Sequence, residues 1–207
     1  MIRKLVVLLV VVGALIAGDM WLKATAESRV AQAMQKTFDS PGTSKVELGG
    51  FPFVLKLISG TIPSAKVTSS SLERDGVMFT DVRMTLEDIE FSVSKIIAGE
   101  LGSVKVRDGH GSAAIKGNDL VAALGAIGGL EVTLRDGKLL VRAGGKEVSA
   151  DVTLKNTNLV VRAPGIGRSF EVALPRFVQG LQYRSVRLSG STVVVEFSLE
   201  NANFRQL

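Results

Sequence analysis

Apolar and polar residues alternate along most of the chain beyond residue 60, and this period of two is typical of β-strands with one buried face. The clearest case lies near the C-terminus, where Val193, Val195, Phe197 and Leu199 occupy every second position. The same alternation occurs in four further segments: Val132–Leu134, Leu139–Ala143, Val148–Leu154 and Leu159–Ala163. The pattern predicts a protein built mainly from antiparallel strands.

One of the predicted strands changes phase partway along its length. Val82, Met84 and Leu86 share one face, whereas the next apolar series begins at Ile89 and continues at every second position. The change falls at Glu87 and Asp88, which are two consecutive polar residues. A shift of one residue moves all following side chains to the other face, so we expect a bulge or a strong bend here.

Turn residues divide the alternating region into hairpins. Asp108–Gly109 and Asp136–Gly137 are dipeptides that favour tight hairpin turns, because both residues tolerate a positive φ angle. Asn156–Asn158 predicts a third turn.

Helical periodicity is confined to shorter stretches. Val30, Met34 and Phe38 are spaced by four residues, which predicts a helix over Ala24–Phe38. Leu174–Leu181 predicts another helix, with proline at its first position. The expected fold class is therefore α+β, in a single domain that combines an N-terminal helix with a long, curved, mainly antiparallel sheet.

The sequence GGFPFVLKLISG at residues 49–60 interrupts the strands with a short apolar helix. The two glycines permit a tight turn, and Pro52 has the fixed φ angle that suits a helix N-terminus. Phe51 and Phe53 fit two different roles equally well. They lie either at an apolar tip or cavity mouth, or in the core, where they would hold the helix against the sheet.

A targeting or anchoring segment precedes this region. Arg3 and Lys4 are followed by Leu5–Gly18, which contains no charge, and this is the arrangement of a secretory signal. Trp21 suits a membrane interface and favours a retained anchor over residues 5–22, although Asp19 interrupts it. We expect residues 1–23 to be a signal peptide or anchor, and residues 24–207 to form an exported domain, periplasmic or on the extracytoplasmic face of the plasma membrane.

Composition limits the chemistry that this domain can perform. The chain has no cysteine and one histidine, which excludes thiolate sites and leaves too few ligands for a catalytic zinc, so we expect no metal or other cofactor. Asp108, His110 and Ser112 are too close in sequence to form a catalytic triad. The formal charge of +5 is spread along the chain, which argues against nucleic acid as a partner.

Several motifs, in their order, resemble those of the LmeA-like phospholipid-binding family of actinobacterial envelope proteins. They are GFPFVLKLISG, IKGNDLVAAL, DGKLLVRA and ALPRFVQGLQYRSVRLSGSTVVVEFSLENANF. The resemblance covers roughly residues 24–204 and implies a tubular lipid-binding fold, in which a highly curved sheet wraps around a long helix and leaves an apolar cavity that holds the lipid tails. It also implies binding of phosphoinositide or another anionic phospholipid, and a role in maintaining mannose-containing lipoglycans, lipomannan among them. It provides no catalytic residues, and we expect a protein that is not an enzyme.

Given that resemblance, the apolar and basic residues around the GGFPF motif and the first long strands become candidate lipid ligands. Acyl chains would contact the apolar residues, and cations would bind the headgroup. The candidate apolar residues are Phe51, Phe53, Leu57, Ile58, Met84, Leu86 and Phe91, and the candidate headgroup residues are Lys56, Lys66 and Arg83. The expected partners are an anionic phospholipid or lipoglycan and a membrane surface.

Two alternatives remain open at the level of sequence. The domain would act as a non-catalytic assembly factor if an exposed strand edge, or the surface of residues 51–58, bound an envelope protein. A hydrolase or transferase acting on lipid-linked sugars would need a catalytic carboxylate, and the cluster of Glu87, Asp88 and Glu90 supplies the first candidates.

Overall fold

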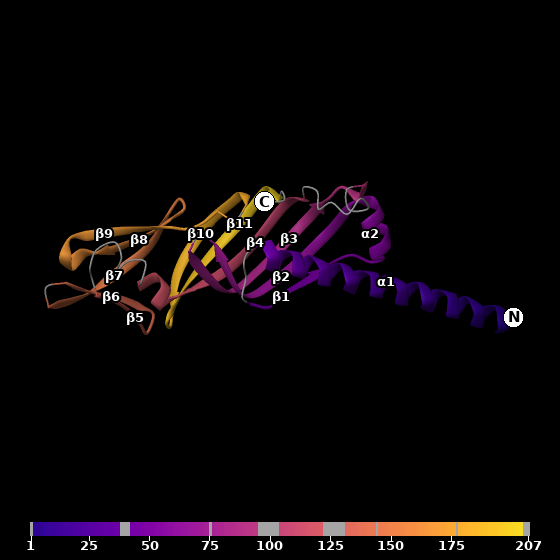
Figure 1. Cartoon of the computed structure of the whole chain (residues 1–207), viewed down its shortest axis with the longest axis horizontal. Coiled ribbons are helices and arrows are strands. Elements are labelled where there is room, and N and C mark those ends of the chain that lie inside the picture. Colours follow the sequence, from indigo (N-terminus) through magenta and orange to yellow (C-terminus); the bar gives the residue numbers. More distant parts are fainter. Residues whose placement is uncertain are drawn as a thin grey trace.

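The protein is an elongated α+β structure, in which a long N-terminal helix projects from one end of two antiparallel sheets (Figure 1). Its computed structural model describes residues 2–37, 42–74, 76–94, 104–121, 131–143, 145–176 and 178–204. The predicted class and the N-terminal helix are confirmed. The elements are α1 (Ile2–Thr37), β1 (Ser44–Leu48), α2 (Phe53–Ser59), β2 (Thr61–Arg74), β3 (Val77–Glu90), β4 (Val104–Lys116), β5 (Glu131–Arg135), β6 (Lys138–Ala143), β7 (Lys146–Lys155), β8 (Asn158–Ala163), the 3₁₀ turn η1 (Pro164–Ile166), β9 (Arg168–Ala173), β10 (Gln179–Ser189) and β11 (Thr192–Phe204).

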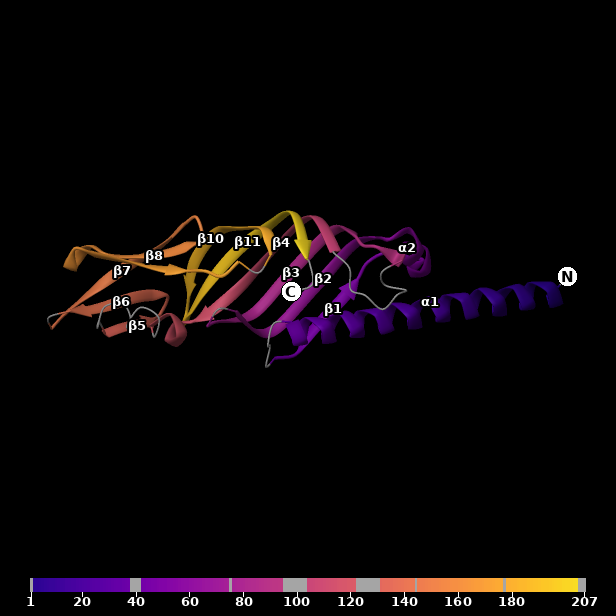
Figure 2. The same ribbon diagram turned by 45° about the horizontal axis from the view of Figure 1, so that its top comes forward.

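The first sheet has six strands in the order β1-β2-β3-β4-β11-β10, and all neighbours are antiparallel. Its strands are long, and the sheet is visibly curved in both views (Figures 1 and 2). Side chains of alternate residues form rows across the strands, and one such row contains Leu48, Ala65, Leu86, Gly109 and Leu199. All five are buried, so this row marks the apolar face of the sheet.

A change of phase crosses this sheet where the sequence predicts a bulge or bend in one strand. Asp88 on β3 has φ 48°, and Asn201 on β11 has the same angle. Both lie opposite Arg107 of β4, as the flanking pairs of residues show. On β10, Gly180 (φ 90°) lies within a register shift against β11 at the same level. The predicted phase change of β3 is therefore confirmed, and it belongs to a line of irregular residues that extends over several strands.

The second sheet contains five shorter strands in the order β5-β6-β7-β8-β9. Strand β7 pairs with β6 through Lys146–Ala150 and with β8 through Asp151–Lys155. The predicted turns at Asp136–Gly137 and at Asn156 are confirmed, and Asp136, Gly137 and Asn156 all have positive φ angles. The backbone N–H of Gly137 donates to the carbonyl oxygen of Gly190 at 2.9 Å, which connects this sheet to the β10–β11 turn of the first.

Helix α1 is longer than the segment predicted from helical periodicity, because it begins at Ile2 rather than at Ala24. Leu22, Ala26 and Ala31 pack against the core, and α1 lies against β1 and α2. The carboxylate of Glu27 accepts a hydrogen bond from the backbone N–H of Leu48 at 2.7 Å. Among the residues that the structure describes, no helix has both the length and the apolar character needed to cross a membrane. The predicted signal or anchor, with its boundary at residue 23, stays a prediction.

Two predictions of local structure are wrong. Asp108–Gly109 lies inside β4 instead of forming a hairpin turn, because Leu86 and Leu199 cover Gly109 from the two neighbouring strands. A β-carbon at Gly109 would approach the nearest carbon of each at 3.1 Å, so a larger residue here would require both leucine side chains to shift. Leu174–Leu181 does not form a helix, since residues 174–176 have no regular secondary structure and β10 begins at Gln179.

One apolar core includes buried residues from both sheets together with Phe53 of α2. The curvature of the sheets agrees with the sequence-based expectation. A sheet wrapped around α1 as a tube stays a prediction, because the observed contacts of α1 are with β1 and α2.

Candidate functional site

The GGFPF motif places its two phenylalanine rings in opposite environments. Phe53 is fully buried at 0% exposure, whereas Phe51 is 66% exposed. The Phe51–Pro52 peptide bond is cis, and Pro52 has φ −68° and ψ 138° as the N-cap of α2. Gly50 has φ 97° and begins the turn. The two rings therefore differ: Phe53 is in the core, as one of the two considered roles requires, and Phe51 is on the surface. A role of Phe51 at an apolar tip or cavity mouth stays a prediction.

Asp19 of α1 attaches the short helix α2 to the long one. Its two carboxylate oxygens accept hydrogen bonds from the first backbone N–H groups of α2, those of Phe53 at 2.8 Å and Val54 at 2.7 Å. Pro52 itself provides no side-chain cap. Asp19 is only 7% exposed, so these are buried, charge-assisted hydrogen bonds. The carboxylate satisfies two N–H groups that a helix leaves without intrahelical partners, and it complements the positive end of the helix dipole.

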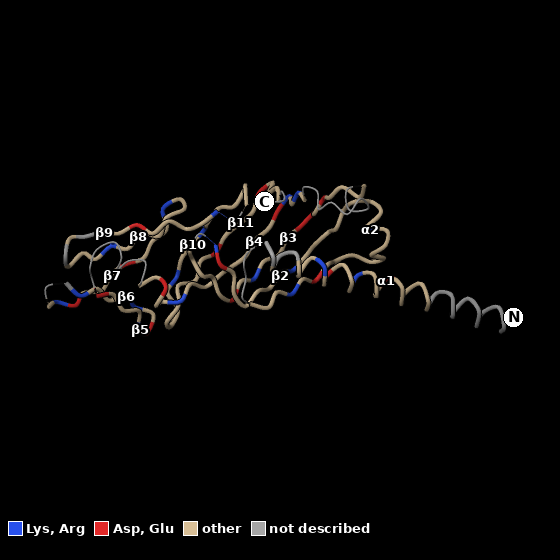
Figure 3. Tube along the Cα trace, in the orientation of Figure 1, with Lys and Arg blue, Asp and Glu red and all other residues tan. Residues whose placement is uncertain are grey.

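Helix α2 has apolar residues on both sides. Phe53 and the half-buried Leu57 face the core, whereas Leu55 and Ile58 are 58% and 68% exposed. Lys56 is half-buried in the same helix. The α2 end of the molecule therefore presents a surface that is poor in charge, while charged residues are distributed over both sheets (Figure 3).

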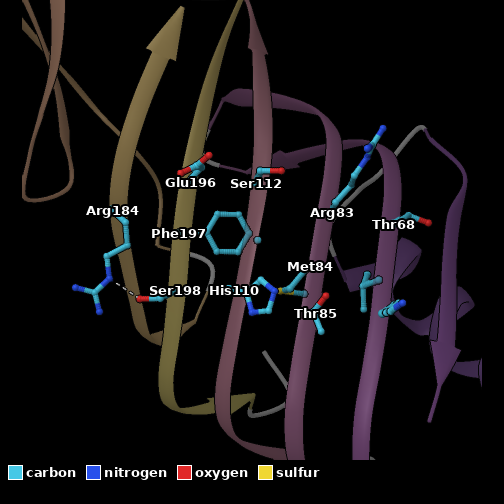
Figure 4. Close-up of a pocket in the computed structure, with 13 residues that line it drawn as sticks. Thr68, Arg83, Met84, Thr85, His110, Ser112, Arg184, Glu196, Phe197 and Ser198 are labelled. Atoms are coloured by element: carbon cyan, nitrogen blue, oxygen red, sulfur yellow. Dashed lines mark hydrogen bonds between the residues drawn. The ribbon is translucent and has the colours of Figure 1, made fainter.

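An open trough of about 650 Å³ crosses the first sheet over β2, β3, β4 and β11 and reaches β10 (Figure 4). Its floor is a row of paired residues: Val67, Met84, Gly111 and Phe197. Val67 and Phe197 are buried at 4% and 7% exposure, so their side chains occupy the apolar face, and the row contributes its backbone to the trough.

Two rows of polar side chains form the walls of the trough. The first row pairs Lys66, Thr85, His110 and Ser198 across the strands, and the second pairs Thr68, Arg83, Ser112 and Glu196. Because side chains alternate between the faces of a sheet, both rows lie on the face opposite the buried side chains of the floor. The trough therefore lies on the face of the sheet opposite the core, and its walls carry polar side chains.

The trough contains three cations and one carboxylate, which favours a negatively charged ligand. Arg184 is engaged within the protein, since its Nε donates to the Ser198 hydroxyl at 2.7 Å and its guanidinium pairs with Glu200. Glu196 accepts a hydrogen bond from the Ser185 hydroxyl at 2.7 Å. These contacts give Arg184 and Glu196 partners within the protein.

Lys66 and Arg83 differ from Arg184 in their contacts. Within the described ranges, neither has a carboxylate at salt-bridge distance. Lys66 pairs with Thr85, two residues from Arg83, so the two cations are diagonal neighbours on one face. Such positions are about 7–8 Å apart, a separation at which two long basic side chains can converge on one phosphate group.

The candidate lipid residues lie in three places instead of one. Lys66 and Arg83 lie in the walls of the trough, and Phe51, Lys56 and Ile58 lie at α2. The remaining members are directed to the core or packed against it: Phe53, Leu57, Met84, Leu86 and Phe91. The structure brings together the two headgroup candidates of the sheet but does not gather all ten residues around one pocket. Their role in lipid binding stays a prediction.

The three carboxylates considered for hydrolysis are not among the residues that line the trough. Glu87, Asp88 and Glu90 are exposed on β3, and Asp88 forms an ion pair with Arg107. His110 is exposed within β4. In the described part of the chain, no group of three histidine or carboxylate side chains is arranged to hold a metal ion.

Sequence reasoning missed Asp19 and Arg184. Asp19 was interpreted as an interruption of an apolar helix, because its partners lie 34 and 35 residues further along the chain. A carboxylate inside a long apolar run was nevertheless a usable signal, since an unpaired buried charge is costly and requires a partner. Arg184 could not be placed before the register of β10 and β11 was known.

Comparison with known proteins gives one match. The sequence model of the LmeA-like phospholipid-binding family matches residues 17–201 of the 207-residue chain. The matched range includes Asp19, α2 and all the residues that line the trough. No curated protein and no solved structure matches this chain at the threshold used.

Proposed function

The chain belongs to the LmeA-like phospholipid-binding family, and we propose that it is an exported protein that holds or carries an anionic phospholipid. The proposed ligand is phosphoinositide-like or a lipoglycan precursor, and the proposed role is the maintenance of envelope lipoglycans without a catalytic step. The family is defined by lipid binding, which supports the ligand class.

The observation that carries the proposal is the pair of cations in the trough. Lys66 and Arg83 are exposed and lie on one face of the sheet, and neither forms an ion pair with a described carboxylate. Glu47 lies opposite Lys66 on β1, where it is paired with Lys45. A phosphate group between them would gain two charge-assisted contacts, while the polar hydroxyls of Thr68, Thr85 and Ser112 would surround the remaining oxygens. The acyl chains would be held by apolar burial, at about 0.8 kcal/mol for each methylene group.

Native mass spectrometry with lipid extraction tests this function. We expect a phospholipid to accompany the wild-type protein, and we expect the protein to take up phosphatidylinositol from vesicles. A double variant, Lys66→Gln with Arg83→Gln, should bind anionic phospholipid roughly 30-fold more weakly, if each cation contributes about 1 kcal/mol. The matched control is Lys155→Gln with Arg162→Gln, which removes two exposed cations from the second sheet.

The outcomes separate the parts of the proposal. Unchanged affinity in the Lys66/Arg83 variant would remove the trough from the proposed site. A wild-type protein that neither carries nor takes up phospholipid would contradict the proposed function as a whole. Equal affinities for phosphatidylinositol and for its deacylated, water-soluble headgroup would show that the acyl chains do not contribute.

A further inference from the structure

The large apolar side chains that are exposed in the described part of the chain all lie on the two helices. They are Leu15, Ile16, Met20, Trp21 and Val30 of α1, and Phe51, Val54, Leu55 and Ile58 of α2 together with its leading turn. The described strands of both sheets carry no large apolar side chain of comparable exposure. Except for Val30, these residues lie within a few positions of the Asp19 contact along α1 or α2. We name these eight residues the apolar tip.

Within α1, one apolar stripe continues from the core of the protein onto its exposed end. Leu22 and Ala26 lie three and seven residues after Asp19, on the same helix face, and they pack against the core. Leu15 and Ile16 lie four and three residues before Asp19, on the same face, and they are 69% and 41% exposed. The stripe therefore extends beyond the sheets in the direction in which α1 projects, and no element among the described residues covers it (Figures 1 and 2).

The hydrogen bonds of Asp19 give the two helices a fixed arrangement at this end. Asp19 would place a negative charge in an apolar surface, but its two oxygens are occupied by the N–H groups of Phe53 and Val54. The contact also holds α2 beside the base of the projecting part of α1. Leu55 and Ile58 then lie on the exposed side of α2, three residues apart, and Phe51 is exposed in the turn that precedes the helix.

We infer that the apolar tip docks into the interfacial layer of an anionic phospholipid bilayer. The choice of a bilayer rests on the proposed phospholipid-binding function and on the composition around the tip. The stripe leads into Leu5–Gly18, which has no charged residue, and Arg3 and Lys4 precede it. Trp21 and Phe51 are aromatic residues close to the Asp19 contact, and Lys23 and Lys56 are half-buried cations beside it. Aromatic rings and lysines with apolar stems are the residues that occupy the boundary between hydrocarbon and headgroups.

The single tryptophan of the chain allows a direct test in the full-length protein. With vesicles of phosphatidylcholine and phosphatidylglycerol, we expect Trp21 emission to shift to shorter wavelength and to be quenched by brominated acyl chains. The double variant Leu55→Asp with Ile58→Asp should bind these vesicles at least roughly tenfold more weakly, because two exposed side chains would no longer enter the apolar layer. Both positions are exposed, so circular dichroism and urea unfolding should show an unchanged fold.

Val30→Asp is the matched control, since Val30 is an exposed apolar residue of α1 outside the tip. It should bind vesicles as the wild type does. Equal vesicle binding by the Leu55/Ile58 variant and the wild type would overturn the inference, because the N-terminal segment alone would then account for binding. A blue-shifted Trp21 emission without vesicles, lost on dilution and absent from the variant, would also overturn it, since the tip would then be an interface between two copies of the chain.

The same samples distinguish this inference from the proposed function. Native mass spectrometry of the Leu55/Ile58 variant should still detect bound phospholipid, because Lys66 and Arg83 are unchanged. A variant that retains bound lipid but fails to dock would support both the inference and the proposed function. A wild-type protein that docks on vesicles without carrying lipid would support membrane docking through the apolar tip, and it would contradict the lipid-carrying function.

Discussion

At the end of the molecule that carries α1 and α2, Phe51 and Ile58 are 66% and 68% exposed, whereas the second sheet at the opposite end buries its apolar residues. Leu139, Val141, Leu159 and Val161 of that sheet are all fully buried at 0% exposure. Both ends are rich in apolar residues, so composition alone does not explain the difference. The strands of the second sheet direct alternate residues to the core, but α2 has too many apolar residues to bury all of them on one side. Exposure at α2 is therefore a local property of this helix and its contact with α1.

The largest expected effect is a loss of stability on replacing Phe53, and it should be absent on replacing Phe51, the other ring of the GGFPF motif. Phe53→Ala should lower the free energy of unfolding by about 3–5 kcal/mol, because it empties a fully buried site. Leu139→Ala, in the second sheet, should cost a comparable 2–5 kcal/mol or so. Phe51→Ala should change the free energy by no more than about 0.5 kcal/mol, since its ring is mostly exposed.

Urea unfolding followed by circular dichroism measures all three variants of that series. If Phe51→Ala were as destabilising as Phe53→Ala, the contrast between a core ring and a surface ring at α2 would be wrong. If Leu139→Ala hardly changed the free energy of unfolding, the core of the second sheet would be less tightly packed than its buried residues indicate.

The hydrogen bonds of Asp19 are expected to have the next largest effect. Asp19→Ala leaves the N–H groups of Phe53 and Val54 without their acceptor, which should cost about 1–3 kcal/mol. Hydrogen exchange at these two amides should become faster than at the amides of the second sheet. Asp151→Ala provides the control, because Asp151 is an exposed carboxylate of β7. Unchanged exchange at Phe53 and Val54 would mean that α2 is held by packing alone.

Much of the fold follows from patterns that are local in sequence. The alternation of Val193, Val195, Phe197 and Leu199 predicted β11, and the phase change at Asp88 was confirmed. Pro52 predicted the start of a short helix, and α2 begins at the next residue. In these cases the signal and the structure involve neighbouring residues.

The features that could not be predicted depend on contacts between distant residues. From the sequence alone, Gly109 was interpreted as a turn residue. Its observed packing between Leu86 and Leu199 could not be predicted, because it depends on the register of three strands. The trough has the same dependence: Lys66 and Arg83 were identified as cations of interest, but only the pairing of β2 with β3 places them on one face. Residues on adjacent strands acquire a common function through register, which a single sequence does not reveal.

The smallest expected effect concerns Tyr183 of the first sheet. Tyr183 lies on β10, which contacts β7 of the second sheet, and its ring packs edge-on against Phe197 at a centroid distance of 6.4 Å. Its hydroxyl donates a hydrogen bond to the carbonyl oxygen of Pro175 at 2.7 Å. Tyr183→Phe should therefore cost about 1 kcal/mol near neutral pH.

Burial raises the pKa of Tyr183 above its ordinary value. The contribution of Tyr183 to the free energy of unfolding should therefore depend on pH. The unfolded chain releases the phenolic proton near pH 10, while the folded protein retains it. Tyr183 should therefore contribute its full stabilisation below about pH 10 and lose it progressively as the pH rises further. Urea unfolding between about pH 8 and pH 11 should show a steeper decline for the wild type than for Tyr183→Phe.

Tyr183 is the single tyrosine of the chain, so tyrosinate absorbance reports on it alone. In the folded protein this absorbance should not develop near pH 10, and it should appear only together with unfolding. Titration of the folded protein near pH 10 would show that the phenol is accessible to water and that the buried hydrogen bond to Pro175 is not maintained. The first sheet would then bury this residue less completely than the second sheet buries Leu139 and Val141.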